Sequence, residues 1–112
     1  MTTPEQLRDR LRGPVIAMTT HFKDDYSLDL DGMRRLTEYY IEQKAPTVIV
    51  TGSTGEFFSL TDEERRQAQK VVIDTVRRAG SGMTVIAGVS HSGTHMTIEL
   101  TRYAESIGAD GV

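Results

Sequence analysis

Residues 47–58 of the chain, TVIVTGSTGEFF, decide the fold that the sequence predicts. The first five residues are all β-branched, which favours a buried strand, and the glycines that follow indicate a tight turn. Similar apolar runs stand at 14–19 (PVIAMT) and 83–88 (MTVIAG), and a fourth begins at 110–112. Continuous runs of this kind are typical of strands buried on both faces, so we expect a parallel sheet.

Longer amphipathic stretches separate these strands. Apolar residues recur at helical spacing within 33–41, 68–79 and 96–107. The segment 61–64 (TDEE) predicts a capping box, and Gly80 and Gly108 predict left-handed helix ends. The alternation fits a doubly wound sheet or an eightfold barrel. The strand that begins at 110–112 would leave backbone N–H and C=O groups without hydrogen-bond partners. We therefore expect a chain cut within a larger domain rather than a small three-stranded domain.

The composition argues against several classes of function. The 13 basic and 16 acidic residues are interspersed, which argues against the concentrated basic face that binds nucleic acid or an anionic membrane. The absence of cysteine excludes disulfides, thiolate zinc sites and a cysteine nucleophile. His91 and His95 have helical spacing but no HExxH-type glutamate between them, so we expect exposed histidines and no metal. No apolar run has the length of a signal peptide or a membrane span, so a cytoplasmic protein is expected.

The candidate site is the turn after the second strand, where α/β folds place ligands. Gly52 and Gly55 let the backbone turn tightly and approach a ligand. Ser53 and Thr54 each offer a hydroxyl and an N–H, which together suit a carboxylate or a phosphate. A tight turn without a ligand is the alternative. The loop lacks the lysine of a Walker A motif and the third glycine of a dinucleotide fingerprint, so no nucleotide cofactor is expected.

The segment GSTGEFFSLTDEER after TVIVT resembles the second strand, loop and helix start of the dihydrodipicolinate synthase/N-acetylneuraminate lyase family, the pyruvate-dependent class I aldolases. The flanks are similar to the same family. GPVIAMTTHFKDDYSLDLDGMRRLTEYYIEQ resembles its first strand and helix, and MTVIAGVSHSGTHMTIELTRYAESIGADGV resembles its third strand, third helix and lead-in to strand four. The resemblance spans residues 14–112. It implies an α/β fold class, with residues 1–112 as the N-terminal portion of a single TIM (β/α)8-barrel domain.

The resemblance also implies an activity for the intact parent. A lysine on a later strand would form a Schiff base with pyruvate or another 2-oxo acid, and the imine would act as the electron sink of a lyase. Ser53 and Thr54, with Gly52, would bind the substrate carboxylate, and Thr54 would also join a catalytic proton relay. The parent would be a homo-oligomer, either a dimer or a tetramer.

Two further residues are expected to support this loop. For Glu56 we favour a carboxylate that accepts backbone N–H bonds and makes the loop rigid, over a general base. Thr19 and Thr20 end the first strand near the same mouth, and Thr20 is the candidate to hydrogen-bond the loop. His21 stands where the family usually has proline; we favour a surface substitution over a contact with substrate.

The family's Schiff-base lysine and relay tyrosines would lie beyond Val112. We interpret the chain's own lysines as solvated and its helical tyrosines as core or rim residues: Lys23, Lys44 and Lys70; Tyr39, Tyr40 and Tyr103. Within the family we favour a 4-hydroxy-tetrahydrodipicolinate synthase-like lyase, with a sugar-acid dehydratase (5-dehydro-4-deoxyglucarate dehydratase-like) or an N-acetylneuraminate lyase-like aldolase as alternatives. The rivals from other classes are a phosphate- or phosphosugar-binding α/β domain and a non-catalytic assembly fragment.

Overall fold

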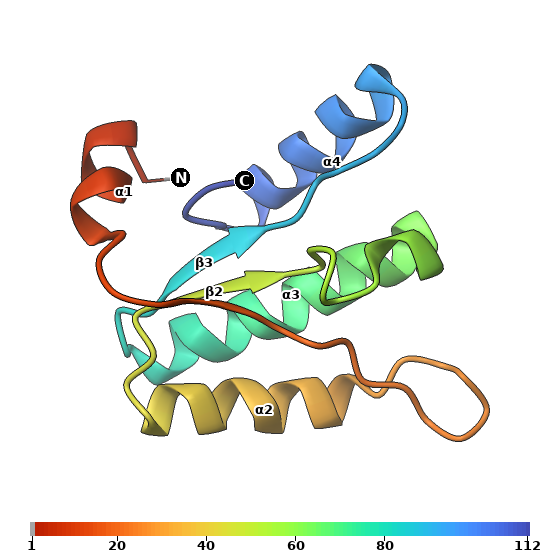
Figure 1. Ribbon diagram of the computed structural model, residues 1–112, viewed down its shortest axis with the longest axis horizontal. Helices are drawn as coiled ribbons and strands as arrows, with labels where there is room; N and C mark the ends of the chain where they lie inside the picture. Colours follow the sequence, from red (N-terminus) through yellow and green to blue (C-terminus); the bar gives the residue numbers. More distant parts are fainter. Residues whose placement is uncertain (1) are drawn as a thin grey trace.

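The computed structural model describes residues 2–112 and alternates helices with short parallel strands (Figure 1). In chain order the elements are α1 Pro4–Arg10, β1 Val15–Ala17, α2 Leu30–Glu42, β2 Thr47–Val50, the 3-10 turn η1 Phe57–Ser59, α3 Asp62–Ala79, β3 Thr84–Ala87 and α4 Thr94–Ser106. The three long helices and three strands lie where the periodicity predicts them. The strands are shorter than predicted, because pairing stops where the chain bends into the loops.

The strands form one parallel sheet in the order β1-β2-β3. The register places Ile16 opposite Val48 and Val48 opposite Val85, so these residues share one face. A fourth strand begins beside β3, where Gly111 forms a parallel bridge with Ile86. The N–H of Ala87 donates to the carbonyl of Gly111 at 3.0 Å. The predicted start of strand four is therefore confirmed.

The core lies between the sheet and its helices. Figure 1 shows α2 and α3 side by side along one face, with α4 beyond α3. Val48, Val50 and Val85 point into this core and are fully buried, as are Val72 and Ile73 of α3. These valine and isoleucine side chains cover the helix-facing side of the sheet, and they fix which face of the sheet packs against the helices.

The opposite face of the sheet is only partly covered, which corrects the expectation of strands buried on both faces. Val15 is 47% exposed, Ala17 is exposed as well, and Ile49 and Ile86 are half-buried. Their side chains alternate with those that point at the helices, as the two-residue period of a strand requires. Within residues 2–112 no second layer packs over β1 on this side.

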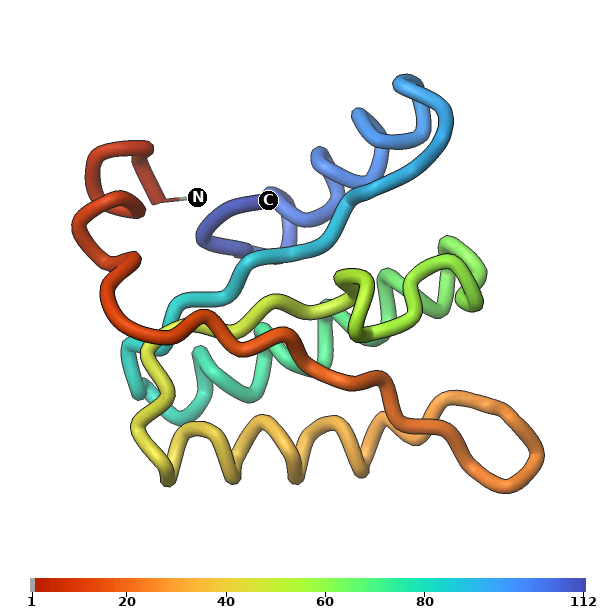
Figure 2. Tube along the Cα trace, viewed as in Figure 1, coloured from red at the N-terminus to blue at the C-terminus, as the bar shows by residue number. Residues whose placement is uncertain are grey.

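Helix α1 was not predicted from the sequence. Its first turn is closed by a capping box, in which Thr3 accepts from the N–H of Gln6 and Gln6 accepts from the N–H of Thr3. The tube in Figure 2 places this helix at the end where the strands begin, while the loop after β1 extends beyond the end where they finish. Helix α1 is therefore remote from the loop that follows β2.

Asp110 joins the ends of α1 and α3 to β3, at the edge of the sheet where the strands begin. Its side chain is 4% exposed and accepts hydrogen bonds from Thr2 (2.8 Å), Arg10 (2.9 Å), Arg77 (2.9 Å) and the backbone N–H of Val85 (2.8 Å). Burial alone would raise the pKa of Asp110, but these donors outweigh it and the pKa lies below its usual value of 3.8. The carboxylate thus joins α1, α3 and β3 in its charged form.

Across the part of the chain that the structure describes, no helix is both long enough and apolar enough to cross a membrane.

Candidate functional site at the end of strand β2

The loop 51–56 leaves β2 at the C-terminal edge of the sheet and turns sharply. Thr51 and Glu56, at its two ends, both have left-handed backbone angles, with φ of 56° and 55°. Between them Ser53 and Thr54 are exposed. Among residues 2–112, neither the backbone N–H nor the hydroxyl of Ser53 or Thr54 donates to any acceptor. Two hydroxyls and two amides are therefore available to an anionic ligand from outside.

The end of β1 supports the loop from behind. The hydroxyl of Thr20, which is buried, donates to the carbonyl of Gly55 at 2.6 Å. A side chain at position 55 would meet the carbonyl oxygen of Met18 at 3.0 Å, so glycine permits this close approach. Thr19 is exposed instead. Of the two threonines considered in the sequence, Thr20 makes the contact with the loop.

The end of β3 supports the loop from the other side. The hydroxyl of Thr51 donates to the carbonyl of Gly88 at 3.1 Å. A Cβ at position 88 would lie 2.2 Å from the carbonyl oxygen of Thr51, which no side chain could tolerate without a backbone shift. Position 88 therefore requires glycine, because the β2 loop passes directly against it.

Two residues of α3, Arg65 and Gln69, complete this support and were missed in the sequence. The amide nitrogen of Gln69 donates to the Thr51 hydroxyl at 2.8 Å and to the Gly88 carbonyl at 3.0 Å. The guanidinium of Arg65 donates to the carbonyls of Gly88 (3.0 Å) and Ser90 (2.8 Å), and burial lowers the pKa of Arg65. One signal could have found them: both polar residues occur at the spacing of the buried face of α3, beside Ala68 and Val72.

The structure corrects the expectation for Glu56. Its side chain is exposed and accepts no hydrogen bond from residues 2–112. The backbone at position 56 is left-handed, and the turn is closed by the N–H of Glu56, which donates to the carbonyl of Ser53 at 3.0 Å. The predicted rigidity comes from Thr20, Arg65 and Gln69 rather than from this carboxylate.

The three lysines are exposed, as the sequence predicts. Lys70 forms an ion pair with Asp74 at 2.9 Å, and the hydrogen bond to that carboxylate raises the pKa of Lys70. A lysine that attacks a ketone needs the opposite shift, since the neutral amine is the nucleophile. Lys23 lies in the loop after β1. Lys44 lies between α2 and the start of β2, whereas Ser53 and Thr54 follow the other end of β2.

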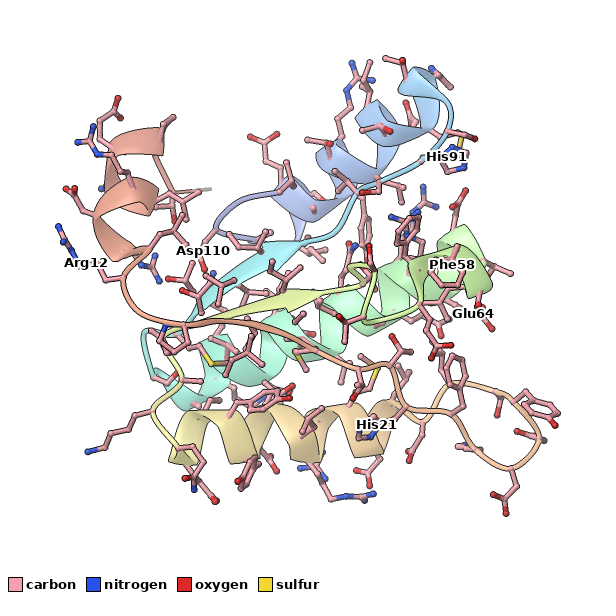
Figure 3. All side chains as sticks on the ribbon, in the orientation of Figure 1. Arg12, His21, Phe58, Glu64, His91 and Asp110 are labelled. Atoms are coloured by element: carbon pink, nitrogen blue, oxygen red, sulfur yellow. The ribbon has the colours of Figure 1, made fainter. Side chains whose placement is uncertain are left out.

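The hydrogen bonds of His21, His91 and Tyr103 are made to residues outside the loop 51–56. His21 is half-buried near the start of α2, where its carbonyl accepts from the N–H of Asp29 at 2.8 Å. His91 is exposed and accepts from the N–H of Gly93 at 3.1 Å. Figure 3 shows His91 and Phe58 at the end of the sheet opposite Asp110. Tyr103 donates to the carbonyl of Arg66 at 3.2 Å, which fits a packing role.

The arrangement has clear similarity to known proteins. The model of the dihydrodipicolinate synthetase family matches residues 10–112. A 4-hydroxy-tetrahydrodipicolinate synthase of Acidothermus cellulolyticus is 41% identical over 113 residues, which cover 100% of this chain and 35% of the relative.

Solved structures agree. The dihydrodipicolinate synthase of Acinetobacter baumannii, complexed with pyruvate, matches with a TM-score of 0.82 and 32% identity over 89% of this chain and 33% of its own. The N-acetylneuraminate lyase of Mycoplasma synoviae matches with a TM-score of 0.80 and 27% identity over 91% of this chain and 34% of its own. The chain spans about a third of the length of these relatives.

Proposed function

Because the chain belongs to the dihydrodipicolinate synthetase family, we propose that it forms the first third of a pyruvate-dependent lyase whose substrate carboxylate binds at Ser53 and Thr54. The sheet β1–β3, with the fourth strand starting at Gly111, is the N-terminal part of a (β/α)8 barrel. Residues 1–112 are then one portion of a single domain. Active sites of such barrels lie at the C-terminal ends of the strands, which is where this loop stands.

One observation carries the proposal: Ser53 and Thr54 are exposed at that end, with hydroxyls and amides that donate to nothing else in residues 2–112. Four donors on two adjacent residues suit the two oxygens of a carboxylate, with the Gly52 backbone making room. The backbone behind them is fixed by buried hydrogen bonds, so little ordering accompanies binding. The pyruvate held by the Acinetobacter baumannii relative supports the choice of a 2-oxo acid over other carboxylates.

The chemistry that follows would use groups from beyond this chain. A lysine from a later strand would condense with the ketone carbon to form an imine, with loss of water. The protonated imine would accept the electron pair of a C–H or carbon–carbon bond that breaks at the neighbouring carbon, and the resulting enamine would return the pair when a new bond forms there or when a hydroxyl group leaves. The carboxylate site would aim the ketone at that lysine, which converts the first step into an effectively intramolecular one. Thr54 would in addition pass a proton through its hydroxyl.

We place the reaction with the synthases of the family. The dehydratase and the N-acetylneuraminate lyase reactions are the alternatives, because a 2-oxo acid would bind through the same carboxylate site in each.

The complete enzyme would be a cytoplasmic homo-oligomer, a dimer or a tetramer. Light scattering of the complete enzyme checks this assembly: a mass of two or four protomers agrees, and a monomer contradicts it.

Borohydride reduction in the presence of pyruvate tests the proposed function. The complete protein should gain one reduced pyruvate on each chain, detected by intact-protein mass spectrometry and located by peptide mapping. The adduct should fall on a lysine outside residues 1–112. Complete protein that stays unmodified would exclude the Schiff-base chemistry.

The rival function, a phosphate- or phosphosugar-binding domain, uses the same four donors. Titration with pyruvate and with inorganic phosphate, followed through the amide resonances of Ser53 and Thr54, separates the two. We expect the shifts to saturate at lower concentration with pyruvate. Tighter binding of phosphate would favour the rival.

A further inference from the structure

The carbonyl oxygen of Gly88 is the point at which three elements meet behind the loop. It accepts hydrogen bonds from the hydroxyl of Thr51 (3.1 Å), the amide of Gln69 (3.0 Å) and the guanidinium of Arg65 (3.0 Å). Gln69 also donates to Thr51 at 2.8 Å. Gln69 thus bonds to the ends of both β2 and β3, and Arg65, one turn earlier on α3, bonds to the segment that follows β3.

Both α3 side chains are unusual for a helix face that packs on a sheet. Arg65 is 2% exposed and Gln69 is fully buried. Among residues 2–112 no carboxylate forms an ion pair with Arg65. Its guanidinium faces the carbonyls of Gly88 and Ser90 and lies 5.1 Å from the centre of the Phe57 ring. The Nε of Arg65 and the Oε1 of Gln69 are buried with no hydrogen-bond partner.

These groups are costly for stability alone. A buried polar atom without a partner destabilises the folded state, and a buried charge does so more strongly. An apolar side chain at either position would fill the same space without that penalty. What the polar side chains add is their hydrogen bonds to the Thr51 hydroxyl and the Gly88 carbonyl. These are the two groups that hold the start of the β2 loop in place.

We propose that Arg65 and Gln69 are positioning residues for the carboxylate site: they hold Thr51 against Gly88 and so fix Ser53 and Thr54 for the substrate. The inference rests on the proposed function, because the loop must bind the 2-oxo acid for its position to matter. Neither residue touches the substrate. Gln69 acts on Thr51, the residue from which the loop starts, and Arg65 acts on the carbonyl of Gly88 that accepts from Thr51.

The test compares Gln69→Leu with Gln67→Leu in the complete enzyme. Gln67 is exposed on the same helix, which makes it a matched control. For Gln69→Leu we expect KM for pyruvate to rise about tenfold, equivalent to about 1.4 kcal/mol, with kcat changed about twofold or less. The midpoint of thermal unfolding should stay the same or rise, because an unpaired buried oxygen is removed. Gln67→Leu should leave all three quantities unchanged.

Arg65→Lys and Arg65→Met provide the second pair of variants. An ammonium keeps the charge but cannot span the Gly88 and Ser90 carbonyls as the fork of a guanidinium does. We therefore expect the KM of Arg65→Lys to lie between those of the wild type and Arg65→Met. An unchanged KM in both Gln69→Leu and Arg65→Met would overturn the proposal. A rise in KM that occurs only in variants whose midpoint of thermal unfolding also falls would overturn it too, because that would show a merely structural role.

The variants Ser53→Ala and Thr54→Val distinguish failure of this inference from failure of the proposed function. If they weaken pyruvate binding and Gln69→Leu does not, the carboxylate site stands and the positioning role falls. If they have no effect on pyruvate, the carboxylate site is wrong and the positioning role falls with it.

Discussion

The residues that carry the proposed chemistry are separated from the residues that hold them in place. Ser53 and Thr54 are exposed, whereas the hydrogen bonds that fix their loop are made by Thr20 from the end of β1 and by Thr51 and Gln69 beneath it. A loop fixed in this way loses little conformational entropy when a ligand binds. The affinity for a small carboxylate should therefore respond to changes that never touch the ligand.

Gly88 offers the sharpest case at the scale of a single residue. In Gly88→Ala the new methyl group would collide with the carbonyl oxygen of Thr51, which lies 2.2 Å from its position. We expect a loss of about 1–3 kcal/mol in the free energy of unfolding, as for other overpacked sites, together with weaker pyruvate binding. Urea unfolding and isothermal titration calorimetry measure the two effects.

Gly93→Ala is the control for this substitution. A Cβ at Gly93 would meet its nearest atom, on His91, at 3.7 Å, which is an ordinary contact. This variant should bind pyruvate as the wild type does. Equal effects of the two substitutions would mean that the close approach of Gly88 to Thr51 does not hold the loop.

The sequence located the loop and one of its supports, Thr20, but not the supports from α3 and β3, and the physical reason differs from residue to residue. Gly52, Ser53 and Thr54 are informative locally, because a strand that runs into two glycines and two hydroxyls limits what the turn can do. Gly88 is 37 residues from Thr51, and its role appears only when β2 and β3 pair. For Glu56 the prediction was wrong, because its carboxylate is exposed and no N–H of residues 2–112 donates to it, which residue type alone could not show.

Helices α3 and α4 differ in how their first turns are satisfied. The side chain of Thr61 accepts from the N–H of Glu64 (3.1 Å) and the carboxylate of Glu64 accepts from the N–H of Thr61 (2.8 Å), as the sequence predicts. Helix α4 starts after Gly93, which has no side chain to cap it, although its backbone is extended like that of Thr61.

Substitutions at these two positions should have opposite effects on stability. Thr61→Ala removes the cap of α3 and should lower the free energy of unfolding by about 1 kcal/mol. Gly93→Asp adds a cap and a negative charge at the start of α4, and should raise the free energy of unfolding by about 0.5 kcal/mol. Thermal unfolding of both variants checks the signs. A stabilised Thr61→Ala would contradict the capping account.

At the scale of whole elements, the longer the periodic pattern, the better the sequence predicted it. The sequences of α2, α3 and α4 each contain an apolar stripe long enough to recognise. The parallel strands are predicted from their unbroken β-branched runs. Helix α1 was missed because its seven residues are mostly charged or polar and none of them is buried. The exposed side chains of β1 were missed because burial depends on what covers a strand, which its own sequence does not state.

The molecule as a whole is held by different means at the two ends of its strands. Neutral and cationic donors hold the loop 51–56 at one end, and at the other end Asp110 accepts hydrogen bonds from Thr2, Arg10 and Arg77. The contacts of Asp110 join residues up to 108 positions apart, so they form only when the chain is folded. The charge of this one carboxylate therefore bears on global stability.

Acid should weaken the fold through Asp110. Its pKa in the folded chain lies below the ordinary value of 3.8, so its contribution is complete above that value and is lost as the pH falls through the folded-state pKa. Asp110→Asn should lower the free energy of unfolding by roughly 1–3 kcal/mol at about pH 7, and should flatten the loss of stability as the pH falls below the ordinary value of 3.8. Urea unfolding across this range measures both.

Asp31→Asn is the control for the acid experiment. The pKa of Asp31 is also lowered, by its hydrogen bond with Arg34, but its side chain is 59% exposed and solvent screens the pair. This variant should follow the wild-type curve. If Asp110→Asn also follows that curve, Asp110 does not hold the N-terminal ends of the strands together.

The central claim is that Ser53 and Thr54 bind the carboxylate of a 2-oxo acid. Isothermal titration of pyruvate into the complete protein, beside the double variant Ser53→Ala/Thr54→Val, tests it most directly. Loss of two hydroxyl donors to a charged group should weaken binding by about tenfold or more, since each such hydrogen bond contributes about 1.5–3 kcal/mol. Pyruvate affinity that is equal in the two proteins would contradict the account.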